Sequence, residues 1–454
     1  MTQLIRAEAA AQTPGARLPS VRELMARHGV GPGTVAAAVA QLAAEGLVET
    51  RPGEGTFVAV RTPSRAAPDH AWQSLALGSS RSQALALGEL VALPAPGALV
   101  LSTGYLPEDL QPLAALTASM RRALRRPGVW DRMDVEGLWP LRAWFAHEAG
   151  GEMSARDVMI VPGSQPAIAT AFRALAAPGA ALVTESPTFV GALSAAAAAG
   201  LRVVPVPTDA RGVRPELLAE ALATSGARVF YCQPTFANPS GAVLAAERRR
   251  EVLEVVRAAG AFLVEDDWAR DLALEGESPP PVAASDRDGH VVYIRSLTKP
   301  AAPGLRVGAL CARGAAFARL KAARTSEDFF VAGPLQETAL QLVTSPAWRR
   351  HLRSTRAALR ERRDALVEAV RRTLGDEALA LVPQGGLHLW VRLPGSRSDE
   401  EAAQRAARAH LVVSPGGRWF PAEAPAPFLR LTFAGAPVEA LRRAVAALAR
   451  IVEA

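Results

Sequence analysis

Lysine is scarce in this sequence, and one of its lysines lies where it could take part in covalent chemistry. The 454 residues include 51 Lys and Arg, and lysine occurs only at positions 299 and 321. An arginine replaces a lysine well in salt bridges, but its guanidinium stays protonated and cannot attack a carbonyl. Lys299 is therefore a candidate for Schiff-base formation, although chance retention explains one isolated lysine equally well.

Polar residues at the ends of predicted strands decide between these explanations. The run "AFLVEDD" ends in Asp266 and Asp267, which lie upstream of the lysine. The segment "VPGSQPAI" reads as a strand, a glycine turn and a helix start, and the backbone N–H groups of such a start can bind a phosphate. Arg306 follows Lys299 closely enough to reach the same phosphate.

Together these residues fit one cofactor. A pyridoxal phosphate site needs a lysine amine, a carboxylate that keeps the pyridine nitrogen protonated, phosphate donors, an aromatic ring over the cofactor and a donor to its phenolic oxygen. Each piece alone is weak, because a strand-end "DD" also suits a turn or a metal site, but their common order favours the cofactor. The candidates, in chain order, are Ser164, Gln165, Phe189, Asn238, Asp266, Ser296, Lys299 and Arg306.

Strands and helices must alternate to bring these residues together, and the sequence predicts that alternation. From about residue 97 onward, short β-branched runs are separated by stretches rich in Ala and Leu, which is typical of βαβ units and a mainly parallel sheet. The predicted strands are "DVMIVPG", "AALVTES", "LRVVPVP", "ARVFYCQP", "AFLVEDD" and "HVVYIRS". A long arginine-rich helix (347–374) with strands at "GLHLWVRLP" and "FLRLTFAG" predicts a smaller α+β lobe at the C-terminal end.

Residues 1–60 read as a separate unit of helices and a β-hairpin. Ser20 and Glu23 form an S-x-x-E capping box at the start of one helix. A second helix is expected over 33–44, followed by two short strands around the glycine-rich tip of "LVETRPGEGTFVAV". Two helices joined by a tight turn and followed by a β-wing are typical of DNA-binding domains.

The stretch between these two regions predicts a linker. Residues 61–95 are rich in Ala, Pro and Ser, and a helical piece is expected within them at 81–92. The predicted organisation is therefore a DNA-binding domain (1–60), a linker (61–95) and one large domain (96–454).

The N-terminal unit resembles the winged helix-turn-helix of GntR-type regulators over residues 15–60. The resemblance implies that Ser20 and Arg22 contact the backbone of the DNA duplex. It also implies that Thr34 starts the recognition helix and that Arg51 lies near the wing. The matching residues are Leu18, Pro19, Ser20, Arg22, Leu24, Thr34, Val35, Glu45, Gly46, Gly53, Gly55, Thr56, Phe57 and Val58.

The start of the recognition helix departs from this family. The segment "GVGPGTVAAAVA" places Gly31, Pro32 and Gly33 where the family carries polar and basic residues. Because the major groove is read mostly through Arg, Lys, Asn and Gln, this helix offers few groups for base readout. Phosphate contacts would then supply most of the affinity for double-stranded DNA, unless the winged-helix fold has lost strong DNA specificity altogether.

Residues 97–454 resemble the fold-type I aminotransferases of the class I and II group. The resemblance implies an α/β fold, with a large domain built on a mostly parallel sheet and a small α+β C-terminal lobe. It implies that Lys299 forms the Schiff base with pyridoxal 5′-phosphate, that Asp266 pairs with the pyridine nitrogen and that Asn238 bonds the phenolic oxygen. Phe189 would stack on the ring, and the implied phosphate ligands are Ser164, Gln165, Ser296 and Arg306.

The same resemblance assigns an amino acid site and a dimer interface. Arg430 in "FLRLTF" matches the arginine that grips an α-carboxylate through a bidentate fork. The segment "DVEGLWPLR" around Gly137 matches the segment that lies at the subunit interface, so a homodimer is expected. Trp268 stands where the family usually has a tyrosine near the phenolic oxygen, and an indole N–H donates a hydrogen bond but cannot ionise.

Bulk composition agrees with a DNA-binding protein in a reducing compartment. The net charge of +7 and the pI near 10.3 are compatible with a nucleic-acid partner, although replacement of lysine by arginine raises the pI by itself. The two cysteines, Cys232 and Cys311, lack metal-ligand spacing and do not suggest a disulfide scaffold. No signal peptide and no apolar run of about 20 residues is evident, so a cytoplasmic protein without a membrane partner is expected.

A GntR-like head followed by an aminotransferase-like domain is the layout of the MocR family of bacterial regulators. The resemblance implies a transcriptional regulator that binds pyridoxal phosphate and senses an amino acid, an amine or the cofactor itself. An active aminotransferase with a weak or vestigial DNA-binding head is the main alternative. A DNA-binding protein whose large domain holds no cofactor would require Lys299 and Asp266 to be accidental.

Overall fold

The structure is a computed structural model that describes residues 1–60, 70–77, 88, 91–93, 95–395 and 398–453. The chain divides into two units, Met1–Ser79 and Ser80–Ala454. Within the segment expected as a linker lies helix α4 (Ala71–Leu77). The helix expected at 81–92 falls mostly on residues outside the described ranges.

The first unit has the predicted helix-turn-helix and wing, preceded by a further helix. Its elements are α1 (Thr2–Ala10), α2 (Val21–His28), α3 (Pro32–Ala44), β1 (Val48–Arg51) and β2 (Gly55–Val58), and the two strands pair antiparallel. The predicted capping box is confirmed, because the Ser20 N–H donates to Glu23 Oε2 (2.7 Å) and the Glu23 N–H donates to Ser20 Oγ (3.3 Å). Gly29 ends α2 with a φ of 63°, a left-handed conformation that favours glycine. The core of this unit comprises Ile5, Ala9, Leu18, Leu24, Val35, Ala38, Val39, Leu42 and Val48.

The second unit is built on the predicted, mainly parallel sheet. β5 runs parallel to β6 and β8, and β9 runs parallel to β8 and β10. β11 is antiparallel to both of its neighbours, and β7 is antiparallel to β6. The eight strands, in their order across the sheet, are β4 (Val158–Val161), β11 (Gly308–Cys311), β10 (Val291–Ser296), β9 (Phe262–Asp267), β8 (Val229–Cys232), β5 (Ala181–Ser186), β6 (Arg202–Asp209) and β7 (Gly212–Val213).

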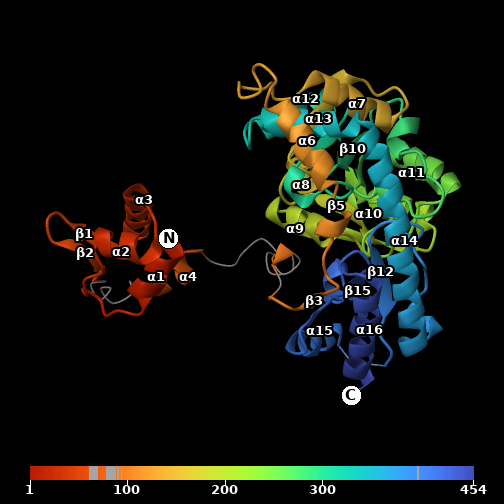
Figure 1. The fold of residues 1–454 in the computed structure, drawn as a ribbon. Coiled ribbons are helices and arrows are strands. Elements are labelled where there is room, and N and C mark those ends of the chain that lie inside the picture. The colour runs from red at the N-terminus through yellow and green to blue at the C-terminus, as the bar shows by residue number, and fades with distance from the viewer. Residues whose placement is uncertain (61–69, 78–87, 89–90, 94, 396–397, 454) are drawn as a thin grey trace. The chain divides into compact units, whose positions relative to one another are not determined.

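Helices cover both faces of this sheet (Figure 1), which explains why most of its strands are apolar throughout. Val158 and Ile160 pack in one apolar cluster with α7 (Trp139–Ala149), α10 (Pro215–Ser225), α11 (Ala246–Ala258) and α13 (Gly333–Val343). Met159 and Val161 point the other way, as alternate residues of a strand must, and pack with α8 (Ser164–Leu175), α9 (Val190–Ala198) and α12 (Gly314–Thr325). α6 (Leu113–Ala123) packs on α13. None of the described helices is long and apolar enough to cross a membrane.

The C-terminal lobe is the predicted smaller α+β lobe. Helix α14 (Pro346–Leu374) lies along both lobes (Figure 1), since Trp348 packs in a cluster of the large sheet and Leu359 packs in the cluster of the small lobe. A short parallel pair, β3 (Leu99–Val100) with β13 (Leu411–Val412), attaches the start of the unit to this lobe. The remaining elements are β12 (His388–Arg392), α15 (Asp399–Arg408), β14 (Ser414–Pro415), β15 (Phe428–Thr432) and α16 (Val438–Glu453).

One edge of the large sheet collects the loops that carry the predicted site residues. The carboxyl ends of parallel strands meet at the same edge, so β5, β8, β9 and β10 all end there. β4 ends there too, because it and β10 are both antiparallel to β11. Gly163, with a φ of 106°, forms the turn from β4 into α8, and Arg306 precedes the start of β11 with a φ of 47°.

Candidate functional site

A cavity of about 470 Å³ lies at this edge of the sheet and brings the predicted site residues together. All nine residues that the sequence assigned to a cofactor or an amino acid line it: Ser164, Gln165, Phe189, Asn238, Asp266, Ser296, Lys299, Arg306 and Arg430. The other lining residues are Val91, Gly104, Tyr105, Gln233, Trp268, Thr298, Pro303 and His388.

Lys299 presents its amine to the cavity from the loop after β10. Its Nζ donates to the Gly104 carbonyl (2.8 Å) and lies 3.9 Å from the centroid of the Tyr105 ring. Burial, together with the charges of Arg430 and Arg306, lowers the pKa of Lys299 to about 7, although Asp266 opposes this effect. A substantial fraction of the amine is therefore neutral, and so nucleophilic, near neutral pH.

Asp266 lies at the end of β9 with one carboxylate oxygen engaged and the other without a partner. Oδ2 accepts hydrogen bonds from the Tyr231 hydroxyl (2.8 Å) and from Gln233 Nε2 (2.7 Å). Oδ1 is buried and has no hydrogen-bond partner among the described residues. Burial raises the pKa of Asp266 to about 6, while the bonds from Gln233 and Tyr231 lower it. Asp266 is thus mostly ionised at pH 7.

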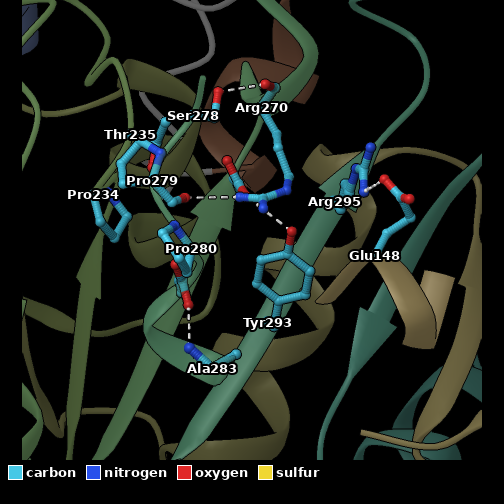
Figure 2. A network of polar contacts seen from close by, with 12 residues as sticks. Glu148, Pro234, Thr235, Arg270, Ser278, Pro279, Pro280, Ala283, Tyr293 and Arg295 are labelled. Atoms are coloured by element: carbon cyan, nitrogen blue, oxygen red, sulfur yellow. Dashed lines mark hydrogen bonds and ion pairs between the residues drawn. The ribbon is translucent and has the colours of Figure 1, made fainter. Parts of the chain in front are cut away.

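Asp267, the alternative carboxylate, is directed into a different network. Its Oδ2 accepts from the Tyr293 hydroxyl (2.8 Å) and pairs with Arg270 Nη1 (3.3 Å). Arg270 also donates to the Pro279 carbonyl (3.0 Å), and Figure 2 shows Arg270 and Tyr293 converging in this network. Asp267 does not line the cavity. The geometry therefore favours Asp266 as the carboxylate that faces a ligand.

The start of α8 and Arg306 form one positively polarised end of the cavity. Arg306 donates to the Pro162 carbonyl (2.6 Å), and a Cβ at Gly163 would lie 2.7 Å from Arg306 Nη2. Only glycine therefore lets the guanidinium lie this close to the turn. Ser164 begins α8, and its buried hydroxyl has no partner among the described residues. Gln165 is less free, because its Nε2 donates to the Gly191 carbonyl (2.8 Å).

Arg430 is a buried cation without a carboxylate partner among the described residues. Its guanidinium lies 4.5 Å from the centroid of the Trp419 ring, and Nη1 donates to Asn238 Oδ1 (3.3 Å). A further bond goes to the Ser102 carbonyl, and Nε has no partner in the described part of the chain. Burial lowers the pKa of Arg430, but a guanidinium stays protonated at neutral pH. An anionic ligand would supply the charge that this arginine lacks.

Two further side chains close the cavity on the side of Lys299. The Trp268 indole N–H donates to the Phe236 carbonyl (3.1 Å), so this donor is already used by the backbone rather than left for a ligand. The His388 ring lies 5.7 Å from the Trp268 ring. Burial, then the charges of Arg430 and Lys299, hold the pKa of His388 well below its usual range, so the imidazole is neutral at pH 7.

Sequence reasoning missed several residues that shape this site. Tyr105, Thr298 and His388 lie outside the strand-end motifs, and nothing in the local sequence distinguishes them. Tyr231 and Gln233 carried a usable signal, because residues two apart on a strand share one face of the sheet. They lie at and just after the end of β8, so both could have been expected on one face of the sheet, although their place beside Asp266 depends on the order of the strands.

The four residues predicted to contact DNA are exposed on the first unit, and they differ in the interactions that their side chains already make. Arg22 forms no ion pair among the described residues, and Thr34 is exposed in the first turn of α3. Ser20 Oγ already accepts the capping bond of α2. Arg51 lies 3.4 Å from Glu49 and stacks over Phe57 (4.6 Å).

The first unit lacks the positive charge expected of a strong DNA binder. Residues 1–60 contain five arginines, five glutamates, no lysine and no aspartate, so their formal charges cancel. Helix α3 has no charged side chain, and its exposed side chains are limited to Pro32, Thr34, Gln41 and several alanines.

This fold and this cavity define a fold-type I transferase domain carried in one chain with a winged-helix domain. Residues 133–448 match the family model "Aminotransferase class I and II", and residues 4–58 match "Bacterial regulatory proteins, gntR family". The chain belongs to the aminotransferase class I and II family and carries a gntR-family domain at its N-terminal end.

Proteins similar to this chain include both regulators and enzymes. The uncharacterized HTH-type transcriptional regulator YisV of Bacillus subtilis is 30% identical over 419 residues, which cover 88% of this chain and 84% of YisV. The HTH-type transcriptional regulator TauR of Rhodobacter capsulatus is 27% identical, with 96% of this chain and 92% of TauR covered. The structure of LysN, an alpha-aminoadipate aminotransferase from Thermus thermophilus complexed with N-(5'-phosphopyridoxyl)-L-leucine, has 28% identity and a TM-score of 0.76, covering 82% of this chain and 95% of LysN.

The cofactor of this family is pyridoxal 5′-phosphate, and the cavity has the features that would hold it. Five residues that line the cavity have a buried polar atom without a partner in the described chain: Ser164 Oγ, Gln165 Oε1, Asp266 Oδ1, Thr298 Oγ1 and Arg430 Nε. Such atoms are costly to leave unpaired. A ligand with a phosphate, a ring nitrogen and an attached carboxylate would supply partners for groups of these types.

Proposed function

We propose that this protein is a transcriptional regulator that binds DNA through residues 1–60 and senses an amino acid or amine at its pyridoxal phosphate site. The observation that supports it most is that the chain has a winged-helix domain and also a cavity that Lys299 and Arg430 both line, and Arg430 has no carboxylate partner in the described part of the chain. The similarity to TauR and YisV along most of their lengths supports this proposal over a free-standing enzyme.

The residues of the cavity have distinct roles in this proposal. When bound, pyridoxal phosphate supplies an aldehyde for an amine and a ring that accepts electrons. Lys299 Nζ would supply that amine, and Asp266 Oδ1, the unpartnered carboxylate oxygen, would hold the pyridine nitrogen. Asn238 is assigned to the phenolic oxygen and Phe189 to the face of the ring. The phosphate is assigned to Ser164, Gln165, Ser296 and Arg306.

Arg430 defines the effector in this proposal. Its guanidinium lies beside Asn238 and has no carboxylate partner among the residues that the structure describes, so an effector carboxylate would gain a charge-assisted pair there while its amine approaches Lys299. An effector that binds two arrangements of the protein with different affinity shifts their populations, and thereby changes affinity for DNA.

The experiment that tests the proposal is a DNA titration with the cofactor-loaded protein. Affinity for the protein's own upstream region is measured with and without a panel of amino acids, and each amino acid is also tested for spectral change of the cofactor. An amino acid that changes both signals supports the regulator. The proposal is contradicted if amino acids alter the spectrum but never alter DNA affinity.

An active aminotransferase remains the second candidate, and one observation favours it. The cavity contains every predicted cofactor residue, whereas the first unit has no net charge and an uncharged recognition helix. Multiple turnover of an amino acid with an α-keto acid acceptor would establish this activity. Reaction of the cofactor with the amino acid that stops before turnover would favour the sensor.

Replacing Asp266 with asparagine is expected to weaken binding of pyridoxal phosphate about tenfold. This factor corresponds to a shift of about one unit in the pKa of the pyridine nitrogen. A neutral amide cannot hold the pyridine nitrogen protonated, whereas the Asp266 carboxylate can. Asp267→Asn is the matched control, because Asp267 binds Tyr293 and Arg270 away from the cavity. Equilibrium titration of both apoproteins with the cofactor measures the difference. A larger loss in Asp267→Asn would reverse the assignment.

A cytoplasmic homodimer completes the proposal. Trp130 and Trp139, which are 77% and 53% exposed, flank the segment around Gly137 that resembles a subunit interface. Burial of such side chains between two copies would remove them from water. Sedimentation of the cofactor-loaded protein at micromolar concentration is expected to give a dimer, and a stable monomer that retains cofactor would contradict it. Cys232 and Cys311 are buried and form no disulfide, which is compatible with a cytoplasmic location.

A further inference from the structure

Gln233 lies between two residues of the proposed cofactor site and bonds to both. Its side chain is 3% exposed and follows the end of β8. Nε2 donates to Asp266 Oδ2 (2.7 Å), and Oε1 accepts from the backbone N–H of Asn238 (2.9 Å). One amide therefore connects the carboxylate assigned to the pyridine nitrogen with the residue assigned to the phenolic oxygen.

The orientation of this amide follows from its partners. A backbone N–H can only donate a hydrogen bond, so the Gln233 atom that faces the Asn238 N–H must be the oxygen. The amide nitrogen then faces Asp266, and Oδ2 of that carboxylate must be an acceptor. A proton on Asp266 would consequently sit on Oδ1, the oxygen without a partner in the described chain.

The backbone of Gln233 is also fixed, by a hydrogen bond to Glu185 on β5. The Gln233 backbone N–H donates to Glu185 Oε2 (2.8 Å), and Glu185 is 3% exposed. Burial raises the pKa of Glu185 to about 8, against the lowering effect of that hydrogen bond, so this carboxyl is mostly neutral at pH 7. Glu185 can therefore accept from Gln233 without placing a full charge behind Asp266.

We propose that Gln233 is a positioning residue that keeps Asp266 Oδ2 in use as an acceptor and leaves Oδ1 as the oxygen presented to the cofactor. The bond to Asn238 fixes the amide in the one orientation that achieves this. The inference rests on the proposed cofactor site and concerns how this chain prepares its carboxylate for a protonated ring nitrogen.

The groups around Asp266 indicate how loss of Gln233 would act. Burial is the main influence and raises the pKa of Asp266, and the bonds from Gln233 and Tyr231 are the main opposing influences. Without Gln233 the pKa of Asp266 rises above its value of about 6, so the carboxylate forms only at higher pH. The titratable groups that act on Asp266 are Tyr231 and Cys232 on β8, Asp267 on β9 and Lys299 after β10, and Glu185 on β5 acts on Tyr231 and bonds to Gln233.

The test measures the dissociation constant of pyridoxal phosphate for apoprotein between pH 6 and pH 9. Gln233→Met keeps the length of the side chain but removes both hydrogen bonds. Its dissociation constant should exceed that of the wild type about threefold near pH 6.5 and about fivefold at pH 6, if the pKa of Asp266 rises by about one unit from about 6. The ratio should fall to about twofold or less at pH 9, where Asp266 is ionised in both proteins.

Two further measurements separate this role from a merely structural one. In an Asp266→Asn background, Gln233→Met should have no pH-dependent effect, because the group through which it acts is gone. If Gln233→Met does not fold, Tyr231→Phe removes the other donor to Oδ2 and should show the same pH-dependent loss. A ratio that stays constant from pH 6 to pH 9 overturns the inference. Failure of the wild type to bind the cofactor at any pH would instead refute the proposed function.

Discussion

Replacing Lys299 with alanine is expected to abolish the visible absorption of pyridoxal phosphate bound to the purified protein. The long-wavelength band requires a covalent bond between the cofactor aldehyde and a protein amine, because the free aldehyde absorbs at shorter wavelength, and Lys299 Nζ is the lysine amine in the cavity. Lys299→Arg should not restore the signal, because a guanidinium keeps its proton at every workable pH. Unchanged absorption in either variant would refute the assignment.

The second lysine of the chain provides the matched control. Lys321 lies on α12 and forms an ion pair with Glu136, away from the cavity. Lys321→Ala should therefore retain the full absorption. If it loses the signal while Lys299→Ala retains it, the cofactor is bound at Lys321.

The pH dependence of cofactor attachment gives an independent check on Lys299. Its pKa is lowered to about 7, mainly by burial, so the neutral amine predominates above pH 7 and the protonated amine below it. The rate at which added pyridoxal phosphate becomes attached should rise with pH and level off above about pH 8. A half-point near the usual lysine pKa would show that the cavity does not perturb this amine.

The fold could be predicted largely because its signals are local. A capping box at Ser20, a left-handed glycine at Gly29 and runs of β-branched residues each specify a helix boundary or a strand within a few residues of chain. The alternation of these elements then leaves a parallel sheet as the simplest arrangement. No comparable local signal marks α1, an alanine-rich helix that packs Ile5 and Ala9 into the small core.

The site was less completely predictable because it depends on which strands become neighbours. Asp266, Asn238 and Lys299 could be found as strand-end residues, and the sheet order β10-β9-β8-β5 then placed them in one cavity. The partners of Asp266 come from β8, so no motif in its own segment predicts them. His388 reaches the cavity from the small lobe, a contact that a local pattern cannot reveal.

The two units of this chain differ in how many side chains they offer for recognition of a ligand or of DNA bases. The cavity keeps its unpaired donors and acceptors in a buried site, where each has a high cost unless a ligand binds. The first unit keeps the scaffold of a winged helix, yet α3 has alanines where hydrogen-bonding side chains could face bases. Ligand recognition is thus chemically specified by this chain, whereas α3 leaves DNA recognition mainly to shape and phosphate contacts.

DNA affinity is accordingly expected to fall about a hundredfold between about 50 and 200 mM salt. A dimer that places Arg22 and Arg51 twice on the duplex would neutralise about four phosphates, and each contact contributes a slope of about 0.9 in log affinity against log salt. The cognate site should be preferred over random duplex by about a thousandfold or less, because few side chains of α3 can reach base edges.

Arg22→Ala should reduce the salt slope by about one for each arginine removed from the complex, since Arg22 has no ion-pair partner among the described residues. Arg27→Ala is the control: Arg27 is already paired with Glu8 at 2.6 Å, and its loss should leave the slope nearly unchanged. Both variants and the wild type are titrated with the upstream region and a scrambled duplex at two salt concentrations.

Tight binding that barely responds to salt would mean that bases are read by other groups. No binding with cofactor and amino acid present would favour the aminotransferase, because a regulator requires a head that reaches DNA in at least one liganded state.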